Sequence, residues 1–168
     1  PSPTSLPTPP PDLDPPPTEG PFAMNLYGDG DFMSQIDVTY SIAASMLTMR
    51  NIMVEGWDRR AATQRQYHSL ARELSPQPLE GPGAEPEGWV GGLNELGLGP
   101  YTLVIEPTFD LAAKSIARAI RFTGRPVGLL IWRGAHTWVV SGFEADADPA
   151  FTDEFEVSGL YISDVWYP

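Results

Sequence analysis

The stretch Val127–Phe143, VGLLIWRGAHTWVVSGF, decides the fold. Two apolar runs, Val127–Trp132 and His136–Phe143, flank the short turn RGA, and both are rich in the β-branched and aromatic residues that favour strands. Strands joined by so short a turn form an antiparallel hairpin. We expect one more strand at about Gly159–Asp164, after a loop rich in Pro, Ala and acidic residues.

A helical pattern begins at Tyr40, well before the hairpin. Apolar residues recur there at helical spacing, at Ile42, Met46, Met49 and Met53, with Ala43, Ala44, Leu47 and Ile52 beside them. We therefore expect a helix that is buried nearly all round. Its methionines are interpreted as core packing, because the unbranched thioether side chain fills irregular gaps.

Two further helices are expected between this one and the hairpin. Ala61–Leu74 has arginines on one side and places His68 among polar neighbours at the surface; its inner residues would be Tyr67, Leu70, Ala71 and Leu74. The next helix opens at Asp110, which would pair with Lys114 four residues later, and it ends at Gly124. Its apolar face would consist of Leu111, Ala112, Ile116, Ala119 and Ile120.

The remaining connections contain one short strand and one long loop. Tyr101–Ile105 alternates like a strand. Ser75–Gly99 is rich in Pro and Gly and long for a loop inside one domain, so we interpret it as a functional or mobile loop that Trp89 and Leu93 pin to the body. Helices first and antiparallel strands second predict an α+β fold.

The N-terminal segment differs from the rest of the chain in composition. Ten of the nineteen prolines lie in Pro1–Pro21. Such a segment buries too little apolar surface to offset the cost of ordering, and its prolines favour extended polyproline II. We therefore predict a disordered or extended tether, residues 1–21, and one domain, residues 22–168. A tether of this kind favours display outside the cell or at its surface, and an intracellular interdomain linker is the alternative.

Charge and residue usage exclude several classes of protein. The chain of 168 residues carries 22 acidic and 10 basic residues, a net charge of −12, and lacks the basic surface that nucleic acids require. Without cysteine it has no disulfide, thiolate ligand or thiol nucleophile, and two histidines are too few for a dedicated metal site. We expect no cofactor. No apolar run approaches the roughly 20 residues of a membrane-spanning helix, so a membrane would be met only through an upstream anchor.

Ser41, His136 and Asp164 are the candidate catalytic residues. Ser41 begins the buried helix, where the helix dipole favours a developing negative charge. His136 opens one strand of the hairpin, and Asp164 ends the last strand. If these two strands are neighbours, the imidazole and the carboxylate meet above the helix start, as an acyl-transfer triad requires.

Each of these residues also has a purely structural interpretation. Ser41 or Thr39 can cap the helix, the commonest role of such residues before an apolar run. His136 can be a strand histidine bonded to backbone, and Asp164 can end the strand in a turn. Gln35 can be an ordinary loop residue. The residue types and their spacing alone do not distinguish these structural interpretations from a catalytic triad.

The order of these residues resembles that of a known family. Gln35 stands six residues before Ser41 at the helix start, GAHTWVVSGF surrounds His136, and YISDVWYP surrounds Asp164. From Gln35 to the end, the chain resembles the papain-like peptidases related to the bacterial bacteriocin-processing (double-glycine leader) enzymes; TGRPVGLLIWRGAHTWVVSGF is the most specific part. The resemblance implies that Gln35 supplies the oxyanion hole, that His136 is the general base and that Asp164 orients it.

The chain departs from this family at the nucleophile. The family has Cys there, usually followed by Gly or Val and then Pro, whereas this chain has Ser41-Ile42-Ala43-Ala44. A Cys–His pair works through a standing thiolate, but a serine hydroxyl must lose its proton to a base in the transition state. Because the neighbours differ as well as the nucleophile, natural degeneration is favoured over an engineered change.

Two functional hypotheses follow from the resemblance. We favour a papain-like domain that has lost peptidase chemistry and serves as a peptide-binding or structural interaction module for a peptide or protein partner. Trp132 and Trp138 would then be groove aromatics or, preferably, core residues. The alternative is an active hydrolase that uses Ser41, His136 and Asp164 with Gln35 as the oxyanion donor.

Overall fold

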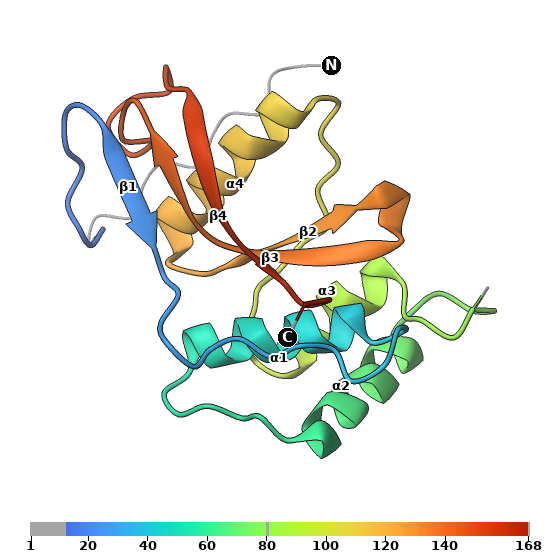
Figure 1. Ribbon diagram of the computed structural model, residues 1–168. Helices are drawn as coiled ribbons and strands as arrows, with labels where there is room; N and C mark the ends of the chain where they lie inside the picture. Colours follow the sequence, from blue (N-terminus) through green and yellow to red (C-terminus); the bar gives the residue numbers. More distant parts are fainter. Residues whose placement is uncertain (1–12, 80, 168) are drawn as a thin grey trace.

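The computed structural model describes residues 13–79 and 81–167, which form four helices and a four-stranded antiparallel sheet (Figure 1). The predicted α+β class is confirmed. The helices are α1 Ser41–Met53, α2 Ala61–Glu73, α3 Pro86–Glu95 and α4 Phe109–Thr123, with a 3-10 turn η1 at Trp132–Gly134. The strands are β1 Phe22–Asn25, β2 Val127–Ile131, β3 His136–Ala145 and β4 Val157–Asp164. Most of the predicted tether, residues 1–12, lies outside the described residues.

β3 is the central strand and pairs with each of the other three. The predicted hairpin is present, with Val127 opposite Val140 and Ile131 opposite His136. β4 pairs with the same part of β3 from the other side and places Asp164 opposite Trp138. The ends of β3 and β4 that carry His136 and Asp164 therefore lie side by side.

Both faces of the sheet are covered by helices (Figure 1). Val139 and Val140 are fully buried, and because successive strand residues point to opposite faces, they belong to different cores. Val139 packs in a cluster with residues of α1, α2 and α3: Ile42, Met46, Met49, Ala71, Trp89 and Leu93. Val140 packs with α4 and the neighbouring strands and loop: Ile116, Ala117, Ile120, Phe143, Ala145 and Phe155. The sheet is thus sandwiched between two helical layers.

α1 is buried nearly all round, as its sequence predicted. Its polar residues are bonded rather than exposed, which is the condition for burying them. The hydroxyls of Ser45 and Thr137 share a hydrogen bond of 2.8 Å, and the Thr48 hydroxyl accepts from the Met33 amide at 3.1 Å. The first bond holds the start of α1 against the start of β3, and the second holds α1 to the loop that precedes it.

The inner face of α2 differs from the prediction. Its buried residues are Thr63, Gln64, His68 and Ala71, whereas Leu74 is 40 % exposed. The prediction of a surface position for His68 is wrong, because its ring stacks on Tyr40 with the centroids 3.9 Å apart. Gln64 is buried because its amide accepts from the Ile36 backbone and donates to the Ser34 carbonyl. This face is polar because it holds the loop that leads into α1.

α3 lies within the stretch predicted as a loop. Trp89 and Leu93 pin it to the body as expected, at 5 % and 2 % exposure. Its glycines weaken the helical pattern, but they permit close packing. A Cβ on Gly88 would lie 2.0 Å from the Ala71 carbonyl oxygen, and one on Gly92 would lie 2.5 Å from Met46 Cε. Tertiary packing here overrides helix propensity.

The strand predicted at Tyr101–Ile105 is absent from the sheet. The Tyr101 backbone is bonded to the Asn94 side chain, which accepts from its amide at 2.7 Å and donates to its carbonyl at 3.0 Å. Beyond it, Val104 and Ile105 are 63 % and 88 % exposed. The alternating residues of Tyr101–Ile105 therefore lie in the connection between α3 and α4, which pairs with no strand among the described residues.

α4 begins and ends close to its predicted bounds, capped by the Thr108 side chain and ended by the left-handed Gly124. The predicted pair of Lys114 and Asp110 is wrong, because Lys114 bonds to Glu156 across the loop before β4, at 2.6 Å. Leu111, predicted on the inner face, is 46 % exposed. The buried face of α4 instead consists of Ala113, Ile116, Ala117, Ile120 and Arg121.

Residues 13–21, the end of the predicted tether, contact the domain directly. Arg121 donates to the Pro15 carbonyl at 2.7 Å, and the Thr18 amide donates to Asp148 at 3.0 Å. This segment leads into β1, which pairs with the far end of β3. The last residues of the segment therefore add to the packed body.

Candidate functional site

His136 and Asp164 form a hydrogen-bonded pair at the end of the sheet. The distance from His136 Nε2 to Asp164 Oδ1 is 2.7 Å. The strands that carry them are neighbours, so the imidazole and the carboxylate meet as the sequence predicted. Since Nε2 is engaged with Asp164, Nδ1 is the ring nitrogen left for a nucleophile.

The surroundings of Asp164 keep its carboxylate charged. Burial raises its pKa, but hydrogen bonds from His136 and from the Trp166 amide, the latter at 3.0 Å, more than offset this, and the pKa lies below its ordinary value. A charged carboxylate only accepts hydrogen bonds, so His136 donates from Nε2. The imidazole is thereby fixed in one orientation and one tautomer.

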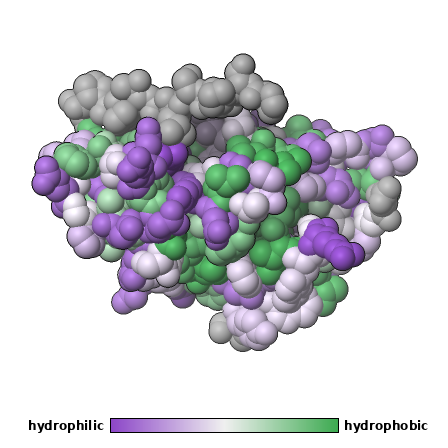
Figure 2. Space-filling view, turned by 90° about the horizontal axis from the view of Figure 1, so that it is seen from above, coloured by the Kyte–Doolittle hydropathy of each residue, from purple (hydrophilic) through white to green (hydrophobic). Residues whose placement is uncertain are grey.

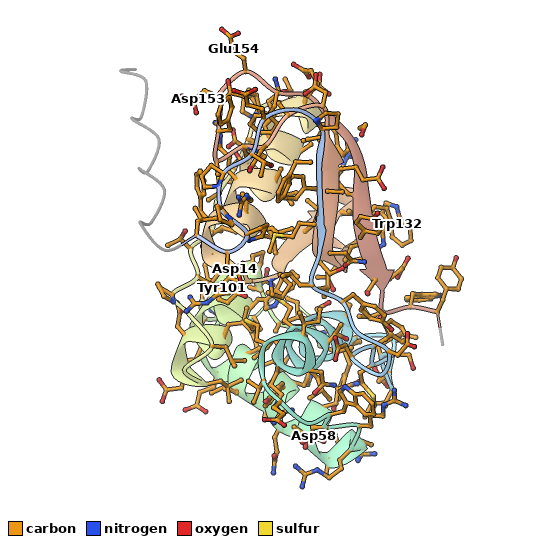
Figure 3. All side chains as sticks on the ribbon, turned by 90° about the vertical axis from the view of Figure 1, so that its left-hand side faces the viewer. Asp14, Asp58, Tyr101, Trp132, Asp153 and Glu154 are labelled. Carbon is orange, nitrogen blue, oxygen red and sulfur yellow. The ribbon has the colours of Figure 1, made fainter. Side chains whose placement is uncertain are left out.

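Two exposed tryptophans flank the buried imidazole. Trp132 stacks on the His136 ring with centroids 5.2 Å apart, and Trp166 meets it edge-on at 5.8 Å. His136 is 2 % exposed, whereas Trp132 and Trp166 are 66 % and 48 % exposed. The core interpretation of Trp132 is therefore wrong: its side chain projects from the edge of the sheet (Figure 3). Trp138 is half-buried.

Trp166 was missed at the level of the sequence. The available signal was an aromatic residue two positions after the candidate Asp164, in the stretch DVWYP. Its place against the imidazole depends on how the chain turns after β4, and no periodicity predicts that turn.

The hairpin tip beside His136 is strained. Trp132 and Arg133 have φ values of +50° and +60°, in the left-handed region that bulky residues rarely adopt. Such positions cost on the order of 1–3 kcal/mol each and occur preferentially at functional sites. The strained conformation places the indole of Trp132 over the imidazole of His136.

Gln35 lies close to the chain that follows Asp164. Its backbone amide donates to the Val165 carbonyl at 2.8 Å, so the segment before α1 and the segment after β4 lie side by side. Its side-chain Nε2 donates to the Asp37 carbonyl at 2.9 Å, and its Oε1 is buried without a partner among the described residues. One of the two side-chain N–H groups that could serve an oxyanion is thus engaged elsewhere.

Ser41 is the first residue of α1 and does not cap it. Tyr40 occupies the N-cap position, and no side chain caps the helix. Thr39 cannot cap because Asp37 binds both its amide, at 3.0 Å, and its hydroxyl, at 2.8 Å. These bonds, the backbone one foremost, lower the pKa of the exposed Asp37. The capping interpretation of Ser41 and Thr39 is therefore wrong.

The start of α1 packs against the start of β3, but Ser41 does not engage His136. Ser45, one turn after Ser41 on the same helical face, shares its hydrogen bond with Thr137, the neighbour of His136. Within the described part of the chain, no hydrogen bond joins Ser41 to His136. The base and its orienting carboxylate are assembled, and among the described residues neither is hydrogen-bonded to Ser41 at the nucleophile position. The catalytic roles remain predictions.

Comparison of the chain with protein-family models, with curated proteins and with solved structures gives no match in any of the three. Among the residues that the structure describes, no helix combines the length and the apolar character needed to cross a membrane.

Proposed function

We propose that this chain is a papain-like domain that has lost peptidase chemistry and binds a peptide or protein partner, outside the cell, at the site around His136. The observation that carries the proposal is the assembled pair of His136 and Asp164, to which Ser41 makes no hydrogen bond among the described residues. A hydrolase would couple its nucleophile to its base, and a binding module has no need to do so.

The arrangement of the remaining site residues supports lost catalysis. One N–H of the Gln35 side-chain amide is bound to the Asp37 carbonyl, and the imidazole is almost completely covered. A serine hydroxyl depends on a base within hydrogen-bond reach of its proton. Exposed tryptophans beside a partly buried polar pair instead offer a surface for peptide contacts, because aromatic side chains dominate the energetics of such interfaces.

The first test is acylation of the serine. Purified chain is incubated with a fluorophosphonate probe, and its intact mass is compared with that of Ser41→Ala treated in the same way. The proposal predicts no adduct on either protein. One adduct on the native chain that Ser41→Ala lacks would contradict lost catalysis and establish the alternative, an active serine hydrolase.

The second test restores the thiol and asks whether the geometry is papain-like. Ser41→Cys would contain one thiol, because the chain has no cysteine. We expect its alkylation by iodoacetamide to persist well below pH 8.5, the usual thiol pKa, because a neighbouring imidazolium stabilises thiolate. The matched control is Ser158→Cys, at an exposed position of β4, which should titrate near pH 8.5.

The imidazole is tested separately in the same background. Adding His136→Gln to Ser41→Cys should return the thiol pKa toward its ordinary value, with native folding checked by circular dichroism. If Ser41→Cys titrates like Ser158→Cys, or if His136→Gln leaves a lowered pKa in place, the papain-like assignment fails.

Binding is tested at the aromatic side chains. Peptides are selected from a random displayed library against the native chain, and their affinities are measured for native protein, for Trp132→Ala and for the control Trp57→Ala, which is 61 % exposed away from His136. The proposal predicts at least tenfold weaker binding to Trp132→Ala alone. Equal binding to all three proteins would place the peptides elsewhere and contradict this site.

A further inference from the structure

A recess of about 380 Å³ lies where β1, β3 and β4 meet the loop that follows β1. Four aromatic side chains line it: Tyr27 and Phe32 from the loop, Tyr161 from β4, and Tyr167 from the segment after β4. We call it the tyrosine groove. Its volume lies within the range of about 300–1,000 Å³ that is usual for ligand sites.

The tyrosine groove lies on the face of the sheet away from α4. Leu160 and Met24 pack against the cluster that contains α4, and successive strand residues point to opposite faces. Their neighbours Tyr161 and Asn25 therefore point to the other face. On that face the layer of α1, α2 and α3 covers Val139, whereas Asn25 is exposed and Tyr161 is 37 % exposed. The groove is thus open to solvent between the helical layers.

The polar groups of the groove suit a peptide with free carbonyls and hydroxyls. The Ser141 hydroxyl donates to Asn25 Oδ1 at 2.9 Å, and within the described part of the chain the two amide N–H groups of Asn25 have no acceptor. Asp164 lines the groove as well, and its carboxylate accepts hydrogen bonds. Flat aromatic faces, amide donors and one carboxylate are therefore offered together.

The chain itself contains a segment with matching chemistry. Residues 1–12 read PSPTSLPTPPPD, in which Leu6-Pro7 and Pro9-Pro10 are two similar dipeptides three residues apart. Polyproline II repeats every three residues and leaves its carbonyls unbonded, so both dipeptides would lie on one side. Segments of this PxxP type bind aromatic-lined grooves, because their preformed conformation loses little entropy on binding. Four hydroxyl side chains in the segment are possible donors to Asp164: Ser2, Thr4, Ser5 and Thr8.

Charge also favours this segment over most others in an acidic protein. The chain carries a net charge of −12, and hydrophilic side chains cover much of the face seen from above (Figure 2). An acidic peptide would be repelled by such a surface. Residues 1–11 have no charged side chain, so the segment approaches the groove without this repulsion.

The anchoring of the segment favours the groove of a second copy. Arg121 of α4 donates to the Pro15 carbonyl, and the Thr18 amide donates to Asp148. The chain that follows residue 12 is therefore held on the side of α4, whereas the groove opens on the other face of the sheet (Figure 1).

We propose that the tyrosine groove binds the Pro-rich segment Pro1–Asp12 of a second copy of this chain. Each copy carries both the groove and the segment, so reciprocal binding closes a symmetric dimer. This inference does not rest on the papain-like assignment, and the groove shares only Asp164 with the proposed site around His136.

The first test concerns the segment. Sedimentation equilibrium of the full chain should show concentration-dependent dimerisation. Pro7→Ala combined with Pro10→Ala should weaken it at least tenfold, because both dipeptides lose their proline. The matched control, Pro3→Ala combined with Pro11→Ala, removes two prolines outside these dipeptides and should dimerise like the native chain. A native chain that stays monomeric into the millimolar range, or equal weakening by the two pairs, would overturn the proposal.

The second test concerns the groove. Tyr167→Ala, at a side chain that is 66 % exposed, should weaken dimerisation at least tenfold, with native folding checked by circular dichroism. The matched control is Phe109→Ala, which is 71 % exposed on α4 and does not line the groove. Native-like dimerisation of Tyr167→Ala, or the same loss in Phe109→Ala, would contradict binding at this groove.

A mixture of the two defective chains tests the exchange between copies. The Pro7→Ala, Pro10→Ala chain keeps its groove, and Tyr167→Ala keeps its segment, so a mixed dimer retains one of the two contacts. The mixture should associate more strongly than either variant alone and less strongly than the native chain. A mixture that associates no better than its components would overturn binding of the segment by a second copy.

Discussion

Two aspartates, Asp148 and Asp164, each bind a basic side chain brought from a distant part of the sequence. Arg121 and Asp148 form a two-point ion pair at 2.8 and 2.9 Å, and both side chains are 0 % exposed. His136 and Asp164 form one bond at 2.7 Å, and the aspartate side chain is 23 % exposed. The first pair is sealed inside the protein, whereas the second opens toward solvent.

The difference lies in what surrounds each pair. Asp148 also accepts from the amides of Thr18 and Ala150, and Phe22 covers the Arg121 guanidinium at 4.6 Å. This centre joins the N-terminal segment, α4 and the loop before β4. The His136 pair is instead flanked by exposed tryptophans and a strained turn. A pair of a basic side chain and an aspartate therefore stabilises the fold where it is enclosed on every side, and such a pair can contribute to recognition where one side is open to solvent.

The largest effect is expected at the sealed pair. Arg121→Met leaves the Asp148 carboxylate buried without its partner, and it should lower the free energy of unfolding by about 3–5 kcal/mol. Urea denaturation measures this. Arg121→Met combined with Asp148→Leu removes both charges and should recover most of the loss; a double variant as unstable as Arg121→Met would show that the bonds themselves, rather than the stranded charge, dominate.

A smaller loss is expected at the open pair. His136→Leu removes the bond to Asp164, but the carboxylate keeps its contact with solvent and with the Trp166 amide. The expected loss of unfolding free energy is about 1–2 kcal/mol. Asp164→Asn is the companion variant and should cost a similar amount. A loss as large as that of Arg121→Met would remove the distinction between the two centres.

Acid should weaken both centres in the same direction. Burial raises the pKa of Asp148, but its bonds to Arg121 and to two amides lower it by more, and the pKa of Asp164 is lowered as well. Each carboxylate thus stabilises the fold at pH above its unfolded pKa, about 3.9, and this stabilisation is lost as the pH falls through the folded pKa. Unfolding free energy measured from pH 6 to pH 2 should fall below about pH 4. The decline should be shallower in Asp164→Asn, which has no carboxylate to protonate at this position, and an unchanged slope there would contradict the lowered pKa.

The smallest effect should have the opposite sign. Arg133 is exposed and held at φ +60°, a conformation that glycine adopts without strain. Arg133→Gly should raise the free energy of unfolding by up to about 1 kcal/mol, seen as a higher melting temperature. Glycine substitution at Arg65, an exposed position inside α2, should be destabilising by a similar amount. A destabilising Arg133→Gly would mean that the turn is not strained in solution.

Local sequence patterns predicted much of this fold. The hairpin around RGA, the nearly all-round burial of α1 and the end of α4 at Gly124 each follow from apolar periodicity or turn chemistry within a few residues. The strand ends that carry His136 and Asp164 were predicted to meet because antiparallel neighbours were expected, and they do meet. These features depend on interactions between residues close in sequence or on one simple pairing.

Other features were decided by tertiary packing. α3 is helical despite its glycines because they fit against α1 and α2, and Tyr101–Ile105 is no strand because Asn94 holds its first residue away from the sheet. At the site, sequence order proposed Ser41, His136, Asp164 and Gln35, but only the packed chain turned the Gln35 amide away and set Trp132 and Trp166 against the imidazole. The physical reason is that periodicity records which face of an element is buried, whereas the orientation of single polar and aromatic side chains depends on partners from distant segments.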